Sequence, residues 1–342
     1  MTSVPGLRDL AERHLATVLD GARTVALVNF PNHGNAGDPA IWLGTRTLLR
    51  RLGVRVGYAS AWWDFDAASL RRAVGSAPVL INGGGNFGDL YQGQQSTRVQ
   101  VLRTLPENPV VQLPQSIHFA DPANEAAMAG IIAAHGGVRL MVRDAASVTI
   151  ARERLGIEPV LSPDHAFGLG PQRREGAARV PVLWLGRPAG DAEHVDHGEP
   201  TGPDVERVEW MAGVTEEQAG WDARGRLAVR VNGWGQATWA PGTRGNGLRH
   251  AVTARTYAPL ARRWVRRGLD IVSRGEVVVT DRLHGHVFCA LLGIPHVALD
   301  NSYGKVSGAL DTWTAGLPGV HRAEDGAQAL ALARELVERG RS

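Results

Sequence analysis

The stretch VVTDRLHGHVFCALLGIPHVALDNSYGKVSG, residues 278–308, decides how this chain is expected to fold. A β-branched run leads into the polar segment Asp-Arg-Leu-His-Gly-His, and an apolar segment of helical length follows. A second strand-like run at 296–300 ends in a loop with Lys305, the only lysine among 37 Lys and Arg residues. A strand, a helix and a second strand in this order predict a parallel sheet.

The same alternation extends through the first half of the chain. Short apolar runs bounded by Gly, Pro, Asn or Asp predict strands at 24–30, 54–59, 78–82, 109–113 and 138–142. Helical spacing is found at 39–52, 66–74, 94–105, 122–134 and 144–155. This alternation favours a parallel sheet covered by helices on both faces.

The second half begins after a Gly- and Arg-rich segment at 168–180, which we interpret as a linker. We expect strands at 181–186, 227–231, 277–280 and 296–300, a loop over 188–224, a helix pair over 250–267 and a helix over 285–292. The predicted fold class is therefore α/β, with two Rossmann-like doubly wound domains that face a cleft. Their bounds are 1–170 for the N-terminal domain, 178–325 for the C-terminal domain and 326–342 for a C-terminal helix.

Composition narrows the class of protein. The chain has 342 residues, 44% of them hydrophobic and 21% charged, which is typical of a globular protein. A formal charge of +3 is too small to indicate nucleic-acid binding, although it favours anionic small molecules or an anionic surface. The single cysteine, Cys289, excludes an internal disulfide and is expected to be buried. The N-terminus lacks the apolar core of a signal peptide, so we expect a cytoplasmic protein.

Polar residues follow the first predicted strand in NFPNHGNAGDPAIWLG, residues 29–44. Parallel sheets bind ligands at the carboxyl ends of their strands, so Asn35 and Asp38 are candidates for a binding cleft. The alternative is a strand–helix turn in which Asp38 caps the helix.

The segment INGGGNFGDLY, residues 81–91, follows another predicted strand. Gly84 and Gly85 would let the backbone approach a ligand closely, with Asn86 beside them. The glycine spacing differs from the dinucleotide fingerprint, so we predict a contact loop and no nucleotide site.

Three further strand ends carry polar residues. Gln115 follows one strand, Arg143 ends the next, and Asp164 lies in SPDHAF near the linker. Arg143 could reach an anion or form a local ion pair, whereas the lone His118 is better explained as a packed loop residue.

The strand end TDRLHGH, residues 280–286, is the strongest candidate. Arg282 offers a planar fork for carboxylate or phosphate, and a helix N-terminus follows it. His284 can transfer a proton near neutral pH. No cysteine or third ligand stands at zinc spacing from His284 and His286, so we expect an anion site and no metal. A structural Asp281–Arg282 pair is the alternative.

These segments, in this order, resemble the polysaccharide pyruvyltransferase family over residues 25–315. The motifs are NHGNAGDPAI, INGGGNFGDLY, QLPQSIHF, VRDAASVTIARERLG, LSPDHAF and VVTDRLHGHVFCALLGIPHVALDNSYGKVSG. The resemblance implies a GT-B-like two-domain fold and transfer of a pyruvyl group from phosphoenolpyruvate to sugar hydroxyls. A pyruvate ketal forms and phosphate leaves. The irregular segment 188–248 departs from the family pattern and concerns the acceptor side.

This chemistry assigns roles to the candidate residues. Arg282 and Lys305 suit the two anionic groups of phosphoenolpyruvate, and His284 is the leading general acid. Asp38 first, and Asp164 second, would position the sugar or act as base. The other predicted substrate contacts are Asn35, Gly84, Gly85, Asn86, Gln115, Arg143 and His286.

The expected partners are phosphoenolpyruvate and a saccharide acceptor, with no cofactor, metal or nucleic acid. The sequence leaves open whether the acceptor is lipid-linked, and whether a cationic surface with the arginines of 244–267 contacts the inner face of a membrane. It also leaves the oligomeric state open. The alternative functions are a glycosyltransferase that uses a nucleotide sugar and a non-catalytic carbohydrate-binding relative.

Overall fold

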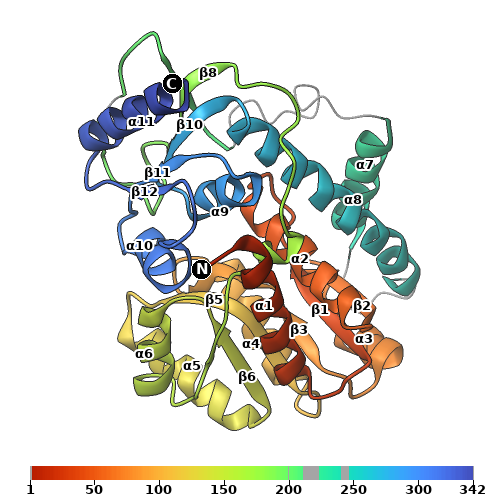
Figure 1. Ribbon diagram of the computed structural model, residues 1–342. Coiled ribbons are helices and arrows are strands. Elements are labelled where there is room, and N and C mark those ends of the chain that lie inside the picture. The colour runs from red at the N-terminus through yellow and green to blue at the C-terminus, as the bar shows by residue number, and fades with distance from the viewer. Residues whose placement is uncertain (1, 199, 211–222, 240–245, 342) are drawn as a thin grey trace.

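Two parallel β-sheets form the framework of the protein (Figure 1). The computed structural model describes residues 2–198, 200–210, 223–239 and 246–341. In Figure 1 the first sheet occupies the lower half of the molecule and the second sheet the upper half. Parallel pairing in both sheets confirms the predicted α/β class.

The first sheet has the strand order β2-β1-β3-β5-β6-β7, and β4 pairs with β5. Its strands are β1 (Thr24–Phe30), β2 (Arg55–Ala61), β3 (Val79–Ile81), β4 (Gly84–Gly88), β5 (Val110–His118), β6 (Val138–Val142) and β7 (Val160–Leu161). The helices of this half are α1 (Val4–Leu19), α2 (Gly37–Arg51), α3 (Ala67–Val74), α4 (Gln92–Thr104), α5 (Pro122–His135), α6 (Ala145–Glu153) and the 3-10 helix η1 (His165–Leu169).

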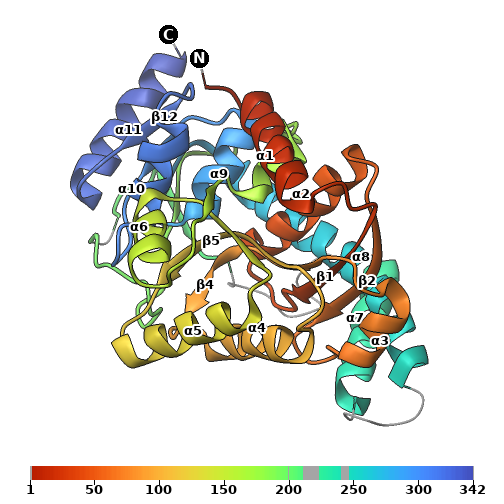
Figure 2. The same ribbon diagram turned by 90° about the horizontal axis from the view of Figure 1, so that it is seen from below.

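Both faces of the first sheet are covered. Val25 and Leu27 of β1 join a buried cluster with α1 and α2, whereas Ala26 and Val28 join a second cluster with α3, α4 and α5. Figure 2 shows α1 and α2 on one side of the sheet and α4 and α5 on the other. Alternate residues of a strand face opposite sides of the sheet. Because helices cover both sides here, consecutive residues of a strand must all be apolar.

The second sheet has the order β12-β11-β10-β8-β9. Its strands are β8 (Val180–Leu185), β9 (Val205–Val208), β10 (Gly275–Thr280), β11 (His296–Ala298) and β12 (Val320–Arg322). The helices of this half are α7 (Ala223–Thr238), α8 (Asn246–Val272), α9 (Leu283–Leu292), α10 (Lys305–Ala309), the π-helical turn η2 (Leu310–Thr314) and α11 (Gly326–Arg341). Residues of α11 and α9 contribute to buried clusters on opposite faces of this sheet.

Both sheets reverse their direction of winding beside their first strand. In the first sheet β1 lies between β2 and β3, and in the second sheet β8 lies between β9 and β10. At such a switch point the loops diverge and open a crevice at the carboxyl ends of the strands. The topology therefore predicts one binding crevice in each half.

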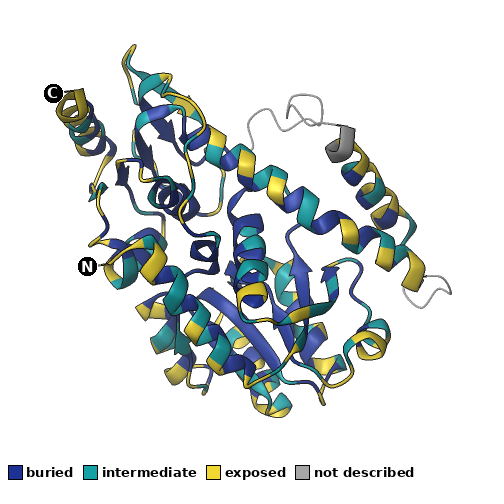
Figure 3. Ribbon diagram, turned by 45° about the vertical axis from the view of Figure 1, so that its right-hand side comes forward, coloured by how far each residue is buried: buried dark blue, intermediate teal, exposed yellow. Residues whose placement is uncertain are grey.

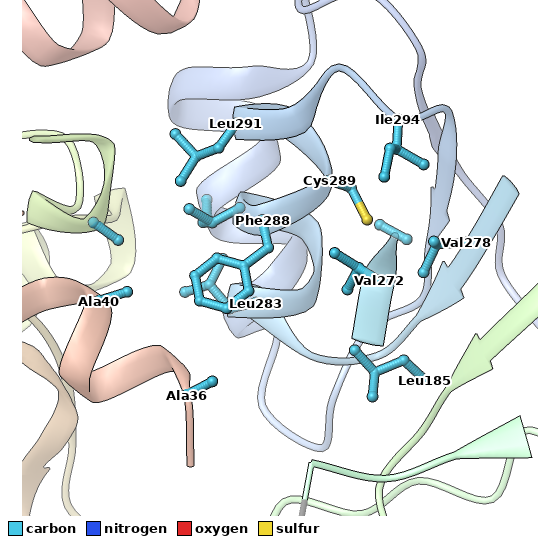
Figure 4. Close-up of a cluster of buried hydrophobic side chains, with 14 of the residues drawn as sticks. Ala36, Ala40, Leu185, Val272, Val278, Leu283, Phe288, Cys289, Leu291 and Ile294 are labelled. Atoms are coloured by element: carbon cyan, nitrogen blue, oxygen red, sulfur yellow. The ribbon is translucent and has the colours of Figure 1, made fainter. Parts of the chain in front are cut away.

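A shared hydrophobic core connects the two halves (Figure 4). Ala36, next to α2, and Ala40 within it belong to the same buried cluster as Leu283 and Phe288 of α9. A Cβ atom on Gly268 of α8 would lie 2.4 Å from Phe288 Cε2 and 2.6 Å from the Ala36 Cβ. Cys289 is buried in this core, as expected.

Helix α8 belongs to the C-terminal part of the chain but packs on the first sheet. Tyr257 stacks on Phe30 with ring centroids 4.4 Å apart, and Leu260 lies in the same cluster as Trp42. The predicted C-terminal domain, residues 178–325, therefore forms the second sheet and also packs a helix on the first sheet. The GT-B-like arrangement of two separate domains stays a prediction.

Two element predictions in the second half are wrong. Residues 227–231 lie in helix α7, because Ala228, Asn232 and Gly235 are buried at helical spacing. The helix pair predicted over 250–267 is one helix, α8, which continues through Pro259. Proline removes one helical hydrogen bond, but packing on the residues before and after it holds the helix.

The sequence also missed several elements, among them β9 and α1. The predicted loop 188–224 contains β9, which adds an edge strand beside β8 with Val182 opposite Val205. Helix α1 precedes the first strand and packs Leu15 and Val18 on the sheet. Among the described helices, none combines the length and the apolar content that crossing a bilayer requires.

A buried histidine between α2 and η1 predicts acid sensitivity. His165 Nδ1 lies 3.0 Å from Thr45 Oγ1, and burial lowers the pKa of His165 to about 4, below its ordinary 6.5. The unfolded chain therefore binds more protons than the folded chain between these values, so stability is complete above pH 6.5 and falls as the pH drops toward 4.

We expect this histidine to contribute about 3 kcal/mol to the loss of unfolding free energy over that range. Urea unfolding from pH 7 to pH 4 should show a shallower decline for His165→Asn than for the wild type. His321→Asn, half-buried on edge strand β12, is the control. An equal change of slope in both variants would contradict the prediction.

Candidate functional site

A cavity of about 320 Å³ lies where the crevices of both sheets meet. Side chains of both halves line it, from the loops that follow β1, β8, β9, β10 and β11 and from the segment that starts with β4. The lining residues are His33, Asn35, Asp38, Gly85, Asn86, Tyr91, Gln94, Arg187, Glu193, Trp210, Arg282, Leu283, His284 and Lys305. The cavity thus coincides with the switch points that the two topologies define.

The second sheet supplies three cationic side chains to this cavity. Arg187 follows β8, Arg282 stands at the N-cap of α9, and Lys305 begins α10. Arg282 Nε donates to the Gly186 carbonyl at 3.2 Å, which fixes the guanidinium at the mouth of the β8 loop. Asp281 accepts from the backbone N–H of Arg187 at 3.2 Å, so it joins the two loops. Asp281 thus contacts the Arg187 backbone, whereas the alternative interpretation paired it with the Arg282 side chain.

Glu193 is a buried carboxylate among these cations. It accepts hydrogen bonds from Lys305 Nζ at 3.2 Å, Tyr303 OH at 2.8 Å and Tyr91 OH at 3.2 Å, and it forms an ion pair with Arg187. Burial alone would raise the pKa of Glu193, but Lys305 and Arg187 lower it to about 2. Glu193 is therefore ionised at neutral pH.

This carboxylate changes the expectation for Lys305. The sequence predicted an ammonium free to bind an anion, whereas the structure pairs it with Glu193. Burial lowers the pKa of Lys305, and the negative charge of Glu193 opposes that shift. An anion that enters the cavity would have to share Lys305 with Glu193.

His284 is held from behind by a buried acid. Its Nε2 lies 3.5 Å from Asp164 Oδ2, and Asp164 is paired with Arg143 Nη1 at 2.5 Å. Burial would raise the pKa of Asp164, but His284 and Arg143 hold it well below its usual range. The sequence analysis predicted that Asp164 lies across the cleft from the histidine. In the structure it lies behind the imidazole and is not among the residues that line the cavity. It can orient the ring.

The other ring nitrogen of His284 faces the N-terminus of α2. A Cβ atom on Gly37 would lie 2.2 Å from His284 Nδ1, so a glycine is needed there. Asn35 Oδ1 accepts from the Gly37 N–H at 3.0 Å, just before α2. The N-cap position of α2 is Ala36, so Asp38 is not the helix cap that the alternative proposed.

Asp38 lines the cavity on the side of the first sheet. Its Oδ2 lies 3.3 Å from His33 Nε2. Burial would raise the pKa of Asp38, but the hydrogen bond from His33 and the charges of His284 and Lys305 lower it to about 2. Asp38 is therefore an ionised hydrogen-bond acceptor at neutral pH.

The glycine-rich segment brings backbone between two cations. A Cβ atom on Gly85 would lie 2.2 Å from Lys305 Nζ and 3.1 Å from Arg143 Nη2. Gly84 has a φ of +137°, a conformation that favours glycine, and its Cβ position is 3.3 Å from Asp38 Oδ1. Glycine is thus required at both positions because neighbouring side chains approach the backbone closely. Of the two glycines, only Gly85 lines the cavity.

Gln115 and Arg143 support the cavity from below without lining it. Gln115 is fully buried, and its Nε2 donates to Asn86 Oδ1 at 2.9 Å. Arg143 is also buried, with Nε donating to Ser116 Oγ at 3.0 Å. Gln115 holds Asn86, which lines the cavity, and Arg143 holds groups behind it. The sequence therefore located the right strand ends, but the direct substrate contact that it predicted for these two side chains does not fit their placement.

His286 lies outside the cavity. Its Nδ1 is 2.7 Å from His296 Nε2 and its Nε2 is 2.9 Å from Thr314 Oγ1, all within the core. Burial lowers its pKa well below the ordinary value. Residues two apart on a helix point in nearly opposite directions, so His284 and His286 cannot both face one cavity. The predicted substrate contact of His286 does not fit this placement.

Several cavity residues were absent from the sequence analysis, namely His33, Tyr91, Gln94, Arg187, Glu193 and Trp210. Arg187 follows the predicted strand 181–186, so the strand-end rule could have identified it. Trp210 follows β9, which was not predicted, and Glu193 lies in a segment without a pattern. Among the residues that the structure describes, no three His, Cys, Asp or Glu side chains form a group that could hold a metal ion.

The fold and the cavity agree with comparison to known proteins. Residues 35–207 and 265–303 match the family model described as polysaccharide pyruvyl transferase, and the chain belongs to this family. It is 30% identical over 335 residues to "Pyruvyl transferase 1" of Schizosaccharomyces pombe (strain 972 / ATCC 24843), covering 94% of this chain and 78% of that protein. It is 28% identical over 309 residues to "Putative pyruvyl transferase EpsO" of Bacillus subtilis (strain 168), covering 89% of each.

A solved structure supports the fold alone. A crystal structure of a protein from Klebsiella pneumoniae subsp. pneumoniae NTUH-K2044 has a TM-score of 0.59 and 17% identity, covering 93% of this chain and 98% of that chain. The family match includes Asp38, Arg187 and His284, so it spans both walls of the cavity. Residues 208–264, between the two matched segments, contain α7 and most of α8.

Removal of the buried carboxylate should make the cavity dependent on an added anion. Glu193→Gln leaves Lys305 and Arg187 without their shared partner, which we expect to lower the unfolding free energy by about 3 kcal/mol. Inorganic phosphate should restore part of this loss, and it should raise the melting temperature of the variant more than that of the wild type. Glu206→Gln is the control, because its ion pair with Arg274 is about one-third exposed. Equal stabilisation of both proteins by phosphate would refute this expectation.

A methyl group at the α2 N-terminus should disturb the packing against His284. Gly37→Ala places its Cβ 2.2 Å from His284 Nδ1, and we expect overpacking to cost about 1–3 kcal/mol. Gly130→Ala is the matched control, because that glycine lies within α5 and its Cβ position is open. Alanine there should stabilise the helix by roughly 0.5–1 kcal/mol. The comparison is made by urea unfolding, and a Gly37→Ala protein as stable as the control would count against the close approach.

Proposed function

We propose that the protein transfers the pyruvyl group of phosphoenolpyruvate to two hydroxyls of a sugar and forms a pyruvate ketal. The observation that carries this proposal is the arrangement of Arg187, Arg282 and Lys305 beside His284 in one cavity of about 320 Å³. That volume is at the lower end of the range for small-molecule sites, roughly 300–1,000 Å³. It suits a three-carbon donor better than a nucleotide sugar.

The donor carries a phosphate and a carboxylate, and both need cationic partners. Arg282 and Arg187 are suited to bidentate contacts with either group, and Lys305 provides a third cation. The N-terminus of α9 begins next to Arg282, and its backbone N–H groups and dipole favour an anion there. Glu193 keeps Arg187 and Lys305 paired and oriented until the donor enters.

The reaction needs one proton for the enol methylene. His284 gives this proton to the methylene carbon, which becomes the methyl group and leaves C2 electrophilic. Two sugar oxygens form bonds to C2 in succession, while the bond from C2 to the phosphate oxygen breaks. Of the two hydroxyl protons, one replaces the proton that His284 donated and the other leaves with phosphate as HPO₄²⁻.

Asp164 and Asp38 have different roles in this scheme. Asp164 orients the His284 ring and is a positioning residue. Asp38 faces the cavity as an ionised acceptor and can orient a sugar hydroxyl, together with Asn35. Its pKa of about 2 makes it a weak base, so orientation is its main contribution.

The finer features of the proposal concern the acceptor and the location. The acceptor would be a sugar of a cell-surface or exocellular polysaccharide precursor, and it would enter between two GT-B-like lobes divided near residues 170–178. The protein would work in the cytoplasm, at the inner face of the membrane when the acceptor is lipid-linked. The scheme requires neither a metal nor a cofactor.

Phosphate release tests the proposal. The wild-type protein with phosphoenolpyruvate and a panel of glycan acceptors should release inorganic phosphate, and mass spectrometry should show the added pyruvyl ketal on one acceptor. Thermal shift measurements compare phosphoenolpyruvate with nucleotide sugars. Stabilisation by a nucleotide sugar but not by phosphoenolpyruvate would favour the glycosyltransferase alternative.

Two variants separate donor binding from proton transfer. His284→Asn should lower kcat by about 10²–10⁴-fold with little change in KM, because a general acid acts in the transition state. Arg282→Gln should chiefly raise KM for phosphoenolpyruvate. Arg13→Gln, on the exposed side of α1, is the control. Unchanged turnover in the His284 variant would remove this residue from the mechanism.

A further inference from the structure

Helices α7 and α8 have an unusual charge. Together they contain nine arginines and one acidic residue, Asp270, a formal charge of +8. The whole chain carries +3, so the remainder of the protein carries −5. A basic region on an otherwise acidic protein has a preferred orientation toward an anionic partner.

The exposed large hydrophobic side chains gather in the same region. Of the five found among the described residues, four lie on α7, at the start of α8 or in the loop between β2 and α3. These four are Trp62 (49% exposed), Leu227 (62%), Trp234 (49%) and Leu248 (75%). We call them, together with Arg230, the α7 surface. Isolated exposed apolar residues are ordinary, but three of them on two basic helices are not.

The packing of α7 determines which side chains face outward. Asn232 Nδ2 donates to Thr256 Oγ1 of α8 at 3.3 Å, and a Cβ on Gly235 would lie 2.0 Å from Thr253 Cγ2. The opposite face is left to solvent, as Figure 3 shows for the outer side of this helix pair. Leu227, Arg230 and Trp234 occupy successive turns of that face.

The loop that carries Trp62 reaches the C-terminal end of α7. Its neighbour Trp63 meets Trp239, just after α7, with ring centroids 6.1 Å apart. Trp63 also lies 3.3 Å from the Cβ position of Gly235. Trp62, the exposed neighbour of Trp63 in this loop, thus comes from a segment that packs against α7.

The α7 surface lies beside the candidate site. Asn32 Nδ2 donates to Gln236 Oε1 of α7 at 3.5 Å, and Asn32 precedes His33, a cavity residue. This is the Asp38 side of the cavity, which the proposed function assigns to the sugar. Residues 208–264, which carry α7 and the start of α8, lie outside the family match, whereas Trp62 lies within it.

We propose that the α7 surface docks on an anionic lipid bilayer. Tryptophan and leucine favour the boundary between headgroups and acyl chains, and arginines near an anionic membrane add to the binding energy. A second copy of the chain fits less well, because two such surfaces would bring like charges together. The biological use rests on the proposed function, since docking here would present the cavity to a lipid-linked acceptor, whereas membrane binding itself requires no catalysis.

Vesicle flotation with the full-length protein tests this proposal. The wild type should bind vesicles of phosphatidylcholine with phosphatidylglycerol, should bind phosphatidylcholine alone much less, and should dissociate as salt increases. Arg230→Gln should weaken binding about fivefold, the effect of one arginine near an anionic surface. Leu227→Ala and Trp234→Ala should weaken it as well, with circular dichroism confirming that each variant is folded.

Two matched variants serve as controls. Leu90→Ala removes the one exposed large hydrophobic side chain of the described residues that lies outside the α7 surface, and Arg13→Gln removes an exposed arginine of α1. Both should bind vesicles as the wild type does. Absence of binding to anionic vesicles would overturn the proposal, and so would equal losses in the controls. Light scattering that shows a dimer dissociated by Leu227→Ala, without vesicle binding, would assign the surface to self-association.

Phosphate release with a soluble acceptor distinguishes this proposal from the proposed function. Vesicle binding without phosphate release would contradict the enzymatic proposal and leave the docking surface standing. Phosphate release without vesicle binding would contradict the docking surface and leave the enzymatic proposal standing.

Discussion

The close contact between the N-terminus of α2 and the start of α9 holds the two sheets against one cavity. Gly37 leaves no room for a side chain beside His284, and Ala36 packs in the same core as Phe288. Small residues let the helix ends approach, and the apolar core behind them keeps the carboxyl ends of both sheets together. Without this contact, each sheet would present only half of the cavity lining.

Charge balance is the second constraint on the cavity. Lys305 and Arg187 are too buried to stand alone, because an unpaired charge away from water is costly. Glu193 satisfies both with one carboxylate, and two tyrosine hydroxyls fix its position. Behind His284, Asp164 and Arg143 form a second buried ion pair. Each of these two charges compensates the cost of burying the other. The cavity therefore keeps several ionised groups in defined positions.

Regular local patterns made much of the fold predictable. Buried strands such as β1 read as continuous apolar runs, and the glycine-rich and Asp-Arg-Leu-His-Gly-His segments marked strand ends that do line the cavity. The pattern failed at 227–231, where a short, mostly apolar run fits a strand and a helix equally well. It also failed for His286, because a motif alone does not show which of its side chains the helix turns inward.

The sequence by itself determined the parallel α/β class, the resemblance to a family that the comparisons then confirmed, and the strand ends from which Asp38, Arg282, His284 and Lys305 come. Only the tertiary structure decided which of these groups meet and what each one contacts. Lys305 and its partner Glu193 are 112 residues apart, and Glu193 lies in a segment that has no local pattern. Strand and helix signals arise from neighbours along the chain, whereas ion pairs and burial depend on segments that meet only when the two sheets pack together.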